Sequence, residues 1–331
     1  MLKSRHFIVV ALTISFVFTS FALADAPIVM KIGHSQPAEH LRHKSLLRFK
    51  EILEAKTKGA IKVEVYHSSQ LGSEAEQLEA VKMGIIQATR GGAFEAVSEK
   101  FVLYTMPFLF KDLDSAHKIT RGPIGAKIAK AAEKNGIYVP ATGDAGGLRN
   151  ITNNARPITK PEDMKGLKLR TPPIESIIRT METLGASPVS IAYGEVYMAL
   201  KTGVADGQEN PYVNITAMKF YEVQKYLTVV NYQYHPDPFC VNLKWYKSLS
   251  PQLQRALDEA SVEMMKYNDQ LVEEETEASF EILKKHMKVN TLSSRARNEF
   301  IKRSQKVYDY FINRRKMFTK AELAEIQKLV Q

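Results

Sequence analysis

IVMKIGHSQPAEHLRHKSLLRFKEILEAKTKGAIKVEVY, residues 28–66, carries the hydrophobic pattern of a strand, a helix and a second strand. Residues 28–33 read as a short buried strand, and residues 61–66 alternate apolar and polar side chains with the period of two that strands have. Between them, the apolar residues of segment 38–58 recur on one helical face, and Gly59 follows the last turn. This order predicts a parallel sheet, so the expected fold class is α/β.

The same alternation continues along the first half of the chain. Ser73 and Glu76 have the spacing of a capping box, which predicts a helix that begins there and ends near Gly84. A third strand is expected around 85–89. The glycine-rich segment 143–147 then predicts a hinge or a close approach of the backbone. We place the first crossing between two domains at this segment.

The expected domain organisation is discontinuous. Residues 147–234 form the second domain, and the chain is expected to return to the first domain at His235, in the segment His-Pro-Asp-Pro. The first domain therefore comprises residues 25–146 and 235–331. Pro251 opens a helical pattern that reaches His286 without glycine or a further proline, roughly 54 Å at 1.5 Å per residue. A helix of this length can brace both domains.

The N-terminal segment predicts export. Lys3 and Arg5 precede an apolar run at 7–21, and Ala-Leu-Ala at 22–24 has the small-x-small pattern of a signal peptidase site. The apolar run is shorter than the ~20 residues that a membrane span needs. We therefore expect residues 1–24 to be a cleaved signal peptide.

Composition and charge are those of a soluble globular protein, with 44% hydrophobic and 25% charged residues. The formal net charge of +10 is spread along the chain rather than concentrated in a stripe, so we expect no nucleic-acid or membrane patch. The single cysteine, Cys240, excludes an internal disulfide and reads as a buried small hydrophobe. The sequence has no long exposed apolar repeat, which favours a monomer.

Two arginines are candidates for carboxylate recognition. Arg149 stands in GGLRNITNN, and Arg170 stands at the end of an apolar-alternating strand in GLKLRTPP. A guanidinium offers paired donors that match a carboxylate and stays charged at any working pH. Each arginine also has an alternative partner in the chain, Asp144 for Arg149 and Asp163 for Arg170.

A polar segment follows these arginines. Residues 206–210, Asp-Gly-Gln-Glu-Asn, read as a polar turn after a helix that ends at Gly203. Taken alone, such a turn is more often a solvated loop than a site. Tyr193 either stacks on a ligand or fills core.

The histidines invite a metal interpretation, since His34, His40 and His43 fall within ten residues. They lack an HExxH spacing or cysteine pairs, and His40 and His43 read as part of a solvated helix face. The sequence also lacks a GxSxG elbow, a P-loop and a GxGxxG fingerprint. We expect no metal, cofactor or catalysis. The alternative is an exported enzyme that uses Glu74, Asp144 or His34 as general acid or base.

Four longer blocks carry a resemblance to a known family. They are VEVYHSSQLGSEAEQLEAVKMG (63–84), ITKPEDMKGLKLRTPP (158–173), LGASPVSIAYGEVYMALKTGVADGQENP (184–211) and KFYEVQKYLTVVNYQYH (219–235). Together they resemble the DctP-type solute-binding proteins of tripartite ATP-independent periplasmic (TRAP) transporters. The resemblance implies a two-domain periplasmic-binding-protein clamshell with mixed sheets. It further implies capture of a small organic acid in the periplasm and delivery to a sodium-coupled membrane permease.

The resemblance also implies roles for individual residues. Arg170 matches the family arginine that makes the main salt bridge to the ligand carboxylate. Arg149 matches a second arginine that holds the same end of the ligand, and Asn210 matches a side chain that hydrogen-bonds the carboxylate region. Tyr193 occupies an aromatic position at the cleft.

The opposite wall leaves the ligand open. Gly91 and Gly92 stand where sialic-acid-binding relatives have an acidic residue, which argues against sialic acid. The distal end of the ligand is expected to meet Arg90, His34, Glu74 and Asp144. An arginine there suits a second carboxylate and hence a C4-dicarboxylate, whereas acidic groups suit sugar hydroxyls. Because acidic groups repel a second carboxylate, we favour a sugar acid such as a hexuronate.

Overall fold

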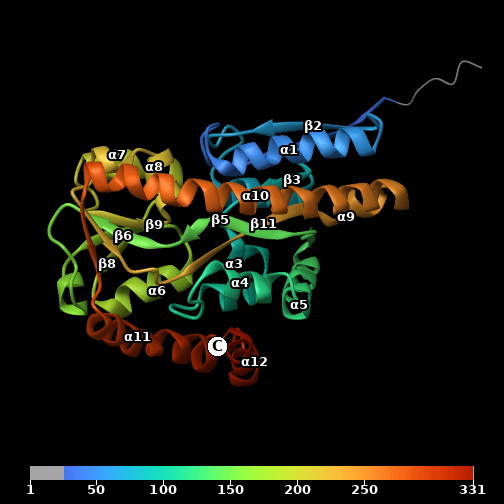
Figure 1. Cartoon of the computed structure of the whole chain (residues 1–331). Helices are drawn as coiled ribbons and strands as arrows, with labels where there is room; N and C mark the ends of the chain where they lie inside the picture. Colours follow the sequence, from blue (N-terminus) through green and yellow to red (C-terminus); the bar gives the residue numbers. More distant parts are fainter. Residues whose placement is uncertain (1–25, 331) are drawn as a thin grey trace, which may run out of the picture.

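The computed structural model describes residues 26–330, which form two six-stranded sheets joined by a pair of crossing strands and one long helix (Figure 1). The first sheet has the order β2-β1-β3-β11-β4, with β5 paired to β11. Its strands are β1 (Ile28–Gly33), β2 (Ile61–Tyr66), β3 (Ala88–Arg90), β4 (Ile137–Tyr138), β5 (Thr142–Leu148) and β11 (Tyr234–Asn242). Strands β1, β2 and β3 are parallel, as the sequence predicts, and β11 runs antiparallel to them.

Helices α1 (Leu41–Lys56) and α2 (Glu74–Met83) lie where the sequence predicts helices. The capping box of Ser73 and Glu76 is present, and α2 ends at Gly84 with a φ of +77°. Such a left-handed C-terminal residue favours glycine, because it has no Cβ.

The second sheet has the order β12-β10-β6-β9-β7-β8. Its strands are β6 (Asn150–Asn153), β7 (Lys168–Thr171), β8 (Ser187–Ser190), β9 (Gly207–Asn210), β10 (Tyr226–Val229) and β12 (Lys288–Thr291). The predicted polar turn at 206–210 is therefore wrong, because residues 207–210 form a buried inner strand. A Cβ on Gly207 would lie 2.1 Å from the carbonyl oxygen of Thr152, so glycine permits the close pairing with β6.

The C-terminal part differs from the expected boundaries. Residues 235–331 were assigned to the first domain, yet β12 pairs with β10 in the second sheet. Helix α11 (Ser294–Asp309) then packs on α6 (Glu175–Leu184), and Phe300 lies in the core of this half. The cause is the long helix, which carries the chain from one sheet to the other before β12 begins.

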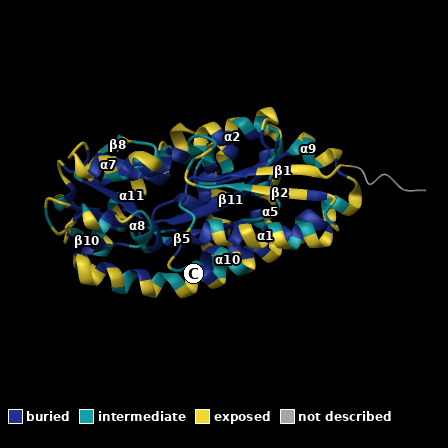
Figure 2. Cartoon of the chain, turned by 90° about the horizontal axis from the view of Figure 1, so that it is seen from above, coloured by how far each residue is buried: buried dark blue, intermediate teal, exposed yellow. Residues whose placement is uncertain are grey.

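That helix, α10, spans Pro251–His286, as the sequence predicts. It runs along both halves of the molecule, and α1 packs along it (Figure 1). Residues in the interior, such as those of β11, are buried, whereas the outward faces of α1 and α10 are exposed (Figure 2). The remaining α-helices are α3 (Phe94–Val97), α4 (Leu113–Thr120), α5 (Pro123–Ala131), α7 (Val196–Lys201), α8 (Tyr212–Ala217), α9 (Leu243–Ser248) and α12 (Lys320–Val330). Within residues 26–330, none of the helices combines the length and hydrophobicity of a membrane span.

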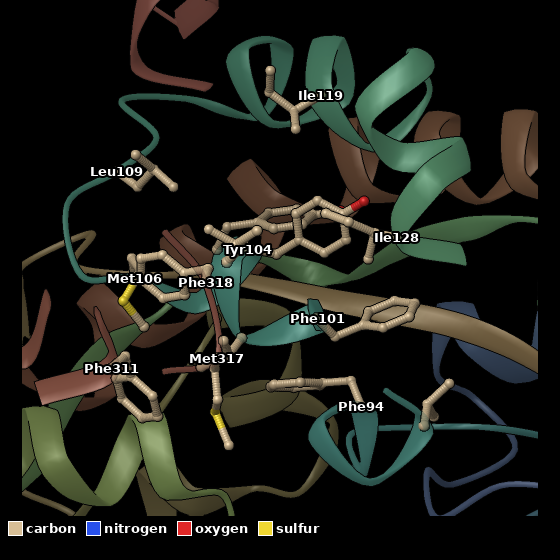
Figure 3. Close-up of a cluster of buried hydrophobic side chains, with 14 of the residues drawn as sticks. Phe94, Phe101, Tyr104, Met106, Leu109, Ile119, Ile128, Phe311, Met317 and Phe318 are labelled. Carbon is tan, nitrogen blue, oxygen red and sulfur yellow. The ribbon is translucent and has the colours of Figure 1, made fainter. Parts of the chain in front are cut away.

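An aromatic core lies between α4, the 3-10 segment Glu99–Thr105 and the C-terminal helices. Figure 3 shows Phe101, Tyr104, Phe311 and Phe318 in this one cluster, and the last two come from the far end of the chain. The segment 103–110 contributes Leu103, Tyr104, Met106, Leu109 and Phe110 to this core. Cys240 is buried, as expected.

The two crossing segments, β5 and β11, pair with each other in antiparallel fashion. The glycine-rich segment 143–147 is thus a strand rather than a loop. The expected close approach is present, because a Cβ on Gly143 would lie 2.5 Å from the sulfur of Met265 in α10. A Cβ on Gly146, whose φ is +118°, would lie 2.6 Å from Oδ1 of Asn214. These glycines let the crossing strand pass between α10 and α8.

Candidate ligand-binding site

A small cavity of about 20 Å³ lies between the two sheets. It is lined by Gln36, Arg42, Glu74, Gly92, Arg149, Arg170, Pro172, Ile174, Tyr193, Asn210, Asn214 and His235. A second hollow adjoins it and shares Glu74, Arg170 and Tyr193. A larger groove between α5 and α10 is mainly apolar, and its Arg121 and Asp269 pair with each other at 2.7 Å. We therefore assign the site to the arginine-lined cavity.

Arg170 is a buried charge with no acidic partner. It lies near the C-terminal end of β7 and is 1% exposed. Its Nε and Nη2 donate to the carbonyl oxygen of Ile191 at 2.9 and 2.7 Å, and no carboxylate among residues 26–330 pairs with it. Asp163, the alternative partner, accepts from Thr159 instead. Burial lowers the pKa of Arg170 to about 10. Because an isolated buried charge is costly, this site favours a bound anion.

Arg149 is equally buried but already paired. Its Nε and Nη2 donate to the carboxylate of Glu209, with Nη2 and Oε1 2.6 Å apart, and its Nη1 donates to Nδ1 of His235. Burial alone lowers the pKa of Arg149, but the adjacent Glu209 carboxylate raises it above its ordinary value. The neutralising acid is therefore Glu209 rather than Asp144.

Arg42 is a cavity residue that sequence reasoning missed. It comes from α1, and its Nε lies 3.0 Å from Oδ2 of Asp237 while its Nη1 lies 3.2 Å from Oε1 of Glu74. The signal was present in the sequence. Arg42 precedes Leu46 by four residues and Phe49 by seven, so it falls on the apolar face of the helix.

Glu74 supplies the acidic group of the first wall. Its Oε1 accepts a 2.6 Å hydrogen bond from Ser35 as well as the bond from Arg42. A Cβ on Gly92 would lie 2.9 Å from Oε2 of Glu74 and 3.3 Å from Nε2 of His235. Glycine at this position therefore leaves room for the carboxylate and the imidazole at the cavity wall.

The hydroxyl of Tyr193 and Oε1 of Gln36 are buried at the cavity and make no hydrogen bond of ordinary geometry in the described part of the chain. The Gln36 side chain nevertheless lies close enough to the hydroxyl to lower its pKa, against the larger effect of burial. Buried polar groups are rarely left unpaired, so both are candidates for ligand contacts. Burial raises the pKa of the Tyr193 hydroxyl to about 12, which keeps it a donor. The ring of Tyr193 also lies 5.8 Å from the guanidinium carbon of Arg170.

Three residues expected at the distal end lie outside the cavity lining, Arg90, His34 and Asp144. Nε of Arg90 lies 3.0 Å from Oδ2 of Asp237, the same oxygen that pairs with Arg42, so Arg90 lies behind Arg42 and shares its carboxylate. Nε2 of His34 is hydrogen-bonded to Nδ1 of His43 at 3.0 Å.

Asp144 belongs to a different cluster, with His117 at 2.6 Å and Asp269 nearby. Among the described residues, His117, Asp144 and Asp269 are the one group whose possible metal-ligand atoms all lie within 4.8 Å of one another. The expected solvated histidine face is wrong for His40, which is the buried N-cap of α1.

The four arginines at and behind the cavity differ in their partners. Three of the four guanidinium groups are ion-paired with three carboxylates among the described residues. The arginines are Arg42, Arg90, Arg149 and Arg170, and the acids are Glu74, Glu209 and Asp237. The uncompensated charge is that of Arg170.

The sequence profile of bacterial extracellular solute-binding protein family 7, the DctP family, matches residues 32–315. The chain belongs to this family of TRAP solute-binding proteins. The C4-dicarboxylate-binding periplasmic protein DctP of Rhodobacter capsulatus is 36% identical over 257 residues, which cover 77% of this chain and 76% of that protein. The 2,3-diketo-L-gulonate-binding periplasmic protein YiaO of Escherichia coli K12 is 32% identical over 248 residues, covering 74% and 75%.

The fold of this TRAP solute-binding protein also matches solved structures. The TRAP periplasmic solute-binding protein of Chromohalobacter salexigens with bound D-glucuronate superposes with a TM-score of 0.85 at 26% identity, covering 91% of this chain and 99% of that one. The mixed α/β architecture of two sheets with a long helix is thus that of TRAP solute-binding proteins.

Proposed function

We propose that this TRAP solute-binding protein captures a sugar acid with a single carboxylate, such as a hexuronate, in the periplasm. The observation that carries the proposal is the buried guanidinium of Arg170, which faces the cavity and has no acidic partner among the described residues. A ligand carboxylate supplies the missing negative charge. Asn210 and Tyr193 add polar contacts at the same end of the cavity, and Arg149 supports it through its pair with Glu209.

The balance of charge separates this proposal from a C4-dicarboxylate. A dianion would place one carboxylate at the unpaired guanidinium of Arg170, and its second carboxylate would meet Glu74. A sugar acid brings one charge, and its hydroxyl groups can donate to Glu74 and to Oε1 of Gln36. The relatives include both classes, since one is named for C4-dicarboxylates and another for a diketogulonate. The dicarboxylate is therefore the second candidate.

Binding is proposed to begin on the second sheet, where Arg170 and Asn210 receive the carboxylate. Closure then brings Arg42, Glu74 and Gln36 over the ligand and expels water. The ion pair strengthens because the effective dielectric falls. A ligand favours the closed form only if it binds that form better, so contacts from both walls are required.

We propose that the captured acid is delivered to a sodium-coupled TRAP permease, and membership of this family supports the proposal. Export is expected to depend on the segment 1–24, which lies outside the described residues. The C-terminal residue range 235–331 contributes to both sheets, so we propose that α10 and the crossing strands form the connection about which the walls move.

A ligand screen tests the proposal directly. We expect D-glucuronate, D-galacturonate or D-galactonate to raise the melting temperature and to give a 1:1 calorimetric isotherm, because a ligand that binds the folded state stabilises it by mass action. Stabilisation by succinate, malate or fumarate alone would replace the sugar acid with the dicarboxylate. Mass spectrometry of the recovered acid tests the rival enzyme, since a chemically altered acid would indicate catalysis.

A further inference from the structure

A hydrogen bond links the first wall to the second beside the cavity. His40 caps α1 beside the first sheet, and Asn214 lies on α8, next to the second. Nε2 of His40 is 3.2 Å from Oδ1 of Asn214, and the two residues are 1% and 2% exposed. Because both are buried, water does not compete for this bond.

The proton in this bond can be assigned from geometry. Nδ1 of His40 accepts the backbone N–H of Arg42 at 3.0 Å. A backbone N–H only donates, so Nδ1 carries no proton and the neutral ring holds its proton on Nε2. His40 is therefore the donor and Oδ1 of Asn214 the acceptor. The amide nitrogen of Asn214 must then face Asn210, whose Oδ1 lies 3.4 Å away.

The hydrogen bonds that orient Asn214 continue to Asn210, which also lines the binding cavity. With its Oδ1 turned to Asn214, Asn210 points its Nδ2 toward Oε1 of Gln208, at 2.6 Å. Gln208 in turn donates to Thr152 at 3.0 Å, and Thr152 donates to Oε1 of Gln224 at 2.9 Å, so the row continues through the second sheet. Both Asn210 and Asn214 line the cavity. The crossing strand leaves space for Asn214 at Gly146, as described above.

We propose that His40 is a positioning residue for ligand binding. Its Nε2–H holds Asn214 and Asn210 in the one orientation that leaves amide N–H groups, rather than carbonyl oxygens, for an anionic ligand. Because donor and acceptor come from opposite walls, the bond also links the two walls. The inference rests on the proposed function, since it concerns the same cavity.

The substitution His40→Asn separates this role from helix capping. Asparagine is a good N-cap whose oxygen can still accept the N–H of Arg42, but it is too short to reach Asn214. We expect His40→Asn to weaken calorimetric binding of D-glucuronate or D-galactonate about tenfold, the loss of roughly one hydrogen bond. Its melting temperature without ligand should stay close to that of His67→Asn, a control at a histidine that contacts Ser68.

A double-mutant cycle tests the pair. If the bond orients Asn214, the double variant His40→Asn with Asn214→Ala should bind no worse than Asn214→Ala alone. Additive losses, or wild-type affinity in His40→Asn, would overturn the inference.

A ligand-independent measurement keeps the inference testable if none of the acids binds and the proposed function fails. Nitrogen-15 NMR of histidine-labelled protein at pH 7 should show His40 with a bare Nδ1 and an exchange-protected proton on Nε2. Asn214→Ala should remove the protection and leave Nδ1 unchanged. A proton on Nδ1, or protection that survives Asn214→Ala, contradicts the assignment.

Discussion

Nη2 of Arg149 and Oε1 of Glu209 lie 2.6 Å apart in a buried ion pair. The guanidinium of Arg170, just as buried, has only a carbonyl oxygen as its partner in residues 26–330. Two arginines of the same cavity therefore differ in what they do for the unliganded protein. Arg149 is compensated and contributes to the fold, whereas Arg170 costs folding free energy that a ligand can offset.

Replacing Arg170 by methionine should abolish binding without harming the fold. We expect the affinity for the preferred acid to fall a hundredfold or more, since charge-assisted hydrogen bonds to the ligand contribute roughly 1.5–3 kcal/mol each. The unliganded variant should melt at the same temperature or higher, because an uncompensated buried charge is removed. Calorimetry and thermal unfolding measure the two effects. Arg170→Lys should also bind poorly, since the paired donors are lost. Binding within a few-fold of wild type in Arg170→Met would refute the carboxylate assignment.

Replacing Arg149 by methionine should destabilise the unliganded protein, which is the opposite of the effect expected for Arg170→Met. The change leaves the Glu209 carboxylate buried without its cation, so we expect a loss of about 3–5 kcal/mol in the free energy of unfolding. Urea unfolding measures this loss. The double variant Arg149→Met with Glu209→Gln is the control and should recover part of it. An unfolding free energy equal to that of wild type would mean that the pair contributes nothing.

Acid should destabilise the protein through His40. Burial, together with the charge of Arg42, lowers its pKa to about 3 from an ordinary value of 6.5, and Arg90 and Lys44 act in the same direction. The unfolded chain therefore binds a proton that the folded protein excludes, so stability rises with pH between about 3 and 6.5. From pH 7 to 5 we expect a loss of at most about 2 kcal/mol from this group.

Unfolding at several pH values checks this prediction by comparing His40→Asn with wild type. The variant should show a shallower pH dependence. Part of the slope should remain, because burial also lowers the pKa of His34. Identical slopes in the two proteins would exclude His40 as the source.

Glycine at position 207 should be required for the second sheet. Gly207→Ala places a Cβ 2.1 Å from the carbonyl oxygen of Thr152, and backbone atoms cannot yield cheaply. We expect a loss of at least about 1–3 kcal/mol, the usual cost of overpacking. Gly194→Ala is the matched control, because no atom of the described residues lies within 4 Å of its added Cβ. Chemical denaturation that finds the two variants equally stable would contradict the register of β9 against β6.

Sequence patterns predicted the elements whose signals are local. The capping box of α2 and the uninterrupted pattern of α10 gave the right helices because each depends on neighbouring residues. Strand β9 was missed because its polar residues become buried only through partners such as Arg149, sixty positions away. The addition of β12 to the second sheet depends on where α10 ends in space, which a linear pattern does not encode.

Only part of the candidate site could be predicted, because local patterns place some of its residues and the pairing of distant segments places the others. Arg170 is recognisable from a strand pattern and from the family blocks, and the structure places it at the cavity. Arg90 was expected there because it follows the predicted strand at 85–89, but it is the last residue of β3 and Asp237 holds it behind the wall. Gln36 and His235 gave no signal, since their place at the cavity depends on the pairing of distant segments.

The shared helix has a thermodynamic consequence for the whole molecule. Leu257 and Met264 of α10 belong to the core of the first sheet, and Leu283 belongs to a core beside the second. Unfolding of either core would expose apolar residues of α10, and the same helix also contributes to the other core. The two halves should therefore denature as one cooperative unit, with a single calorimetric transition, even though each has a sheet of its own.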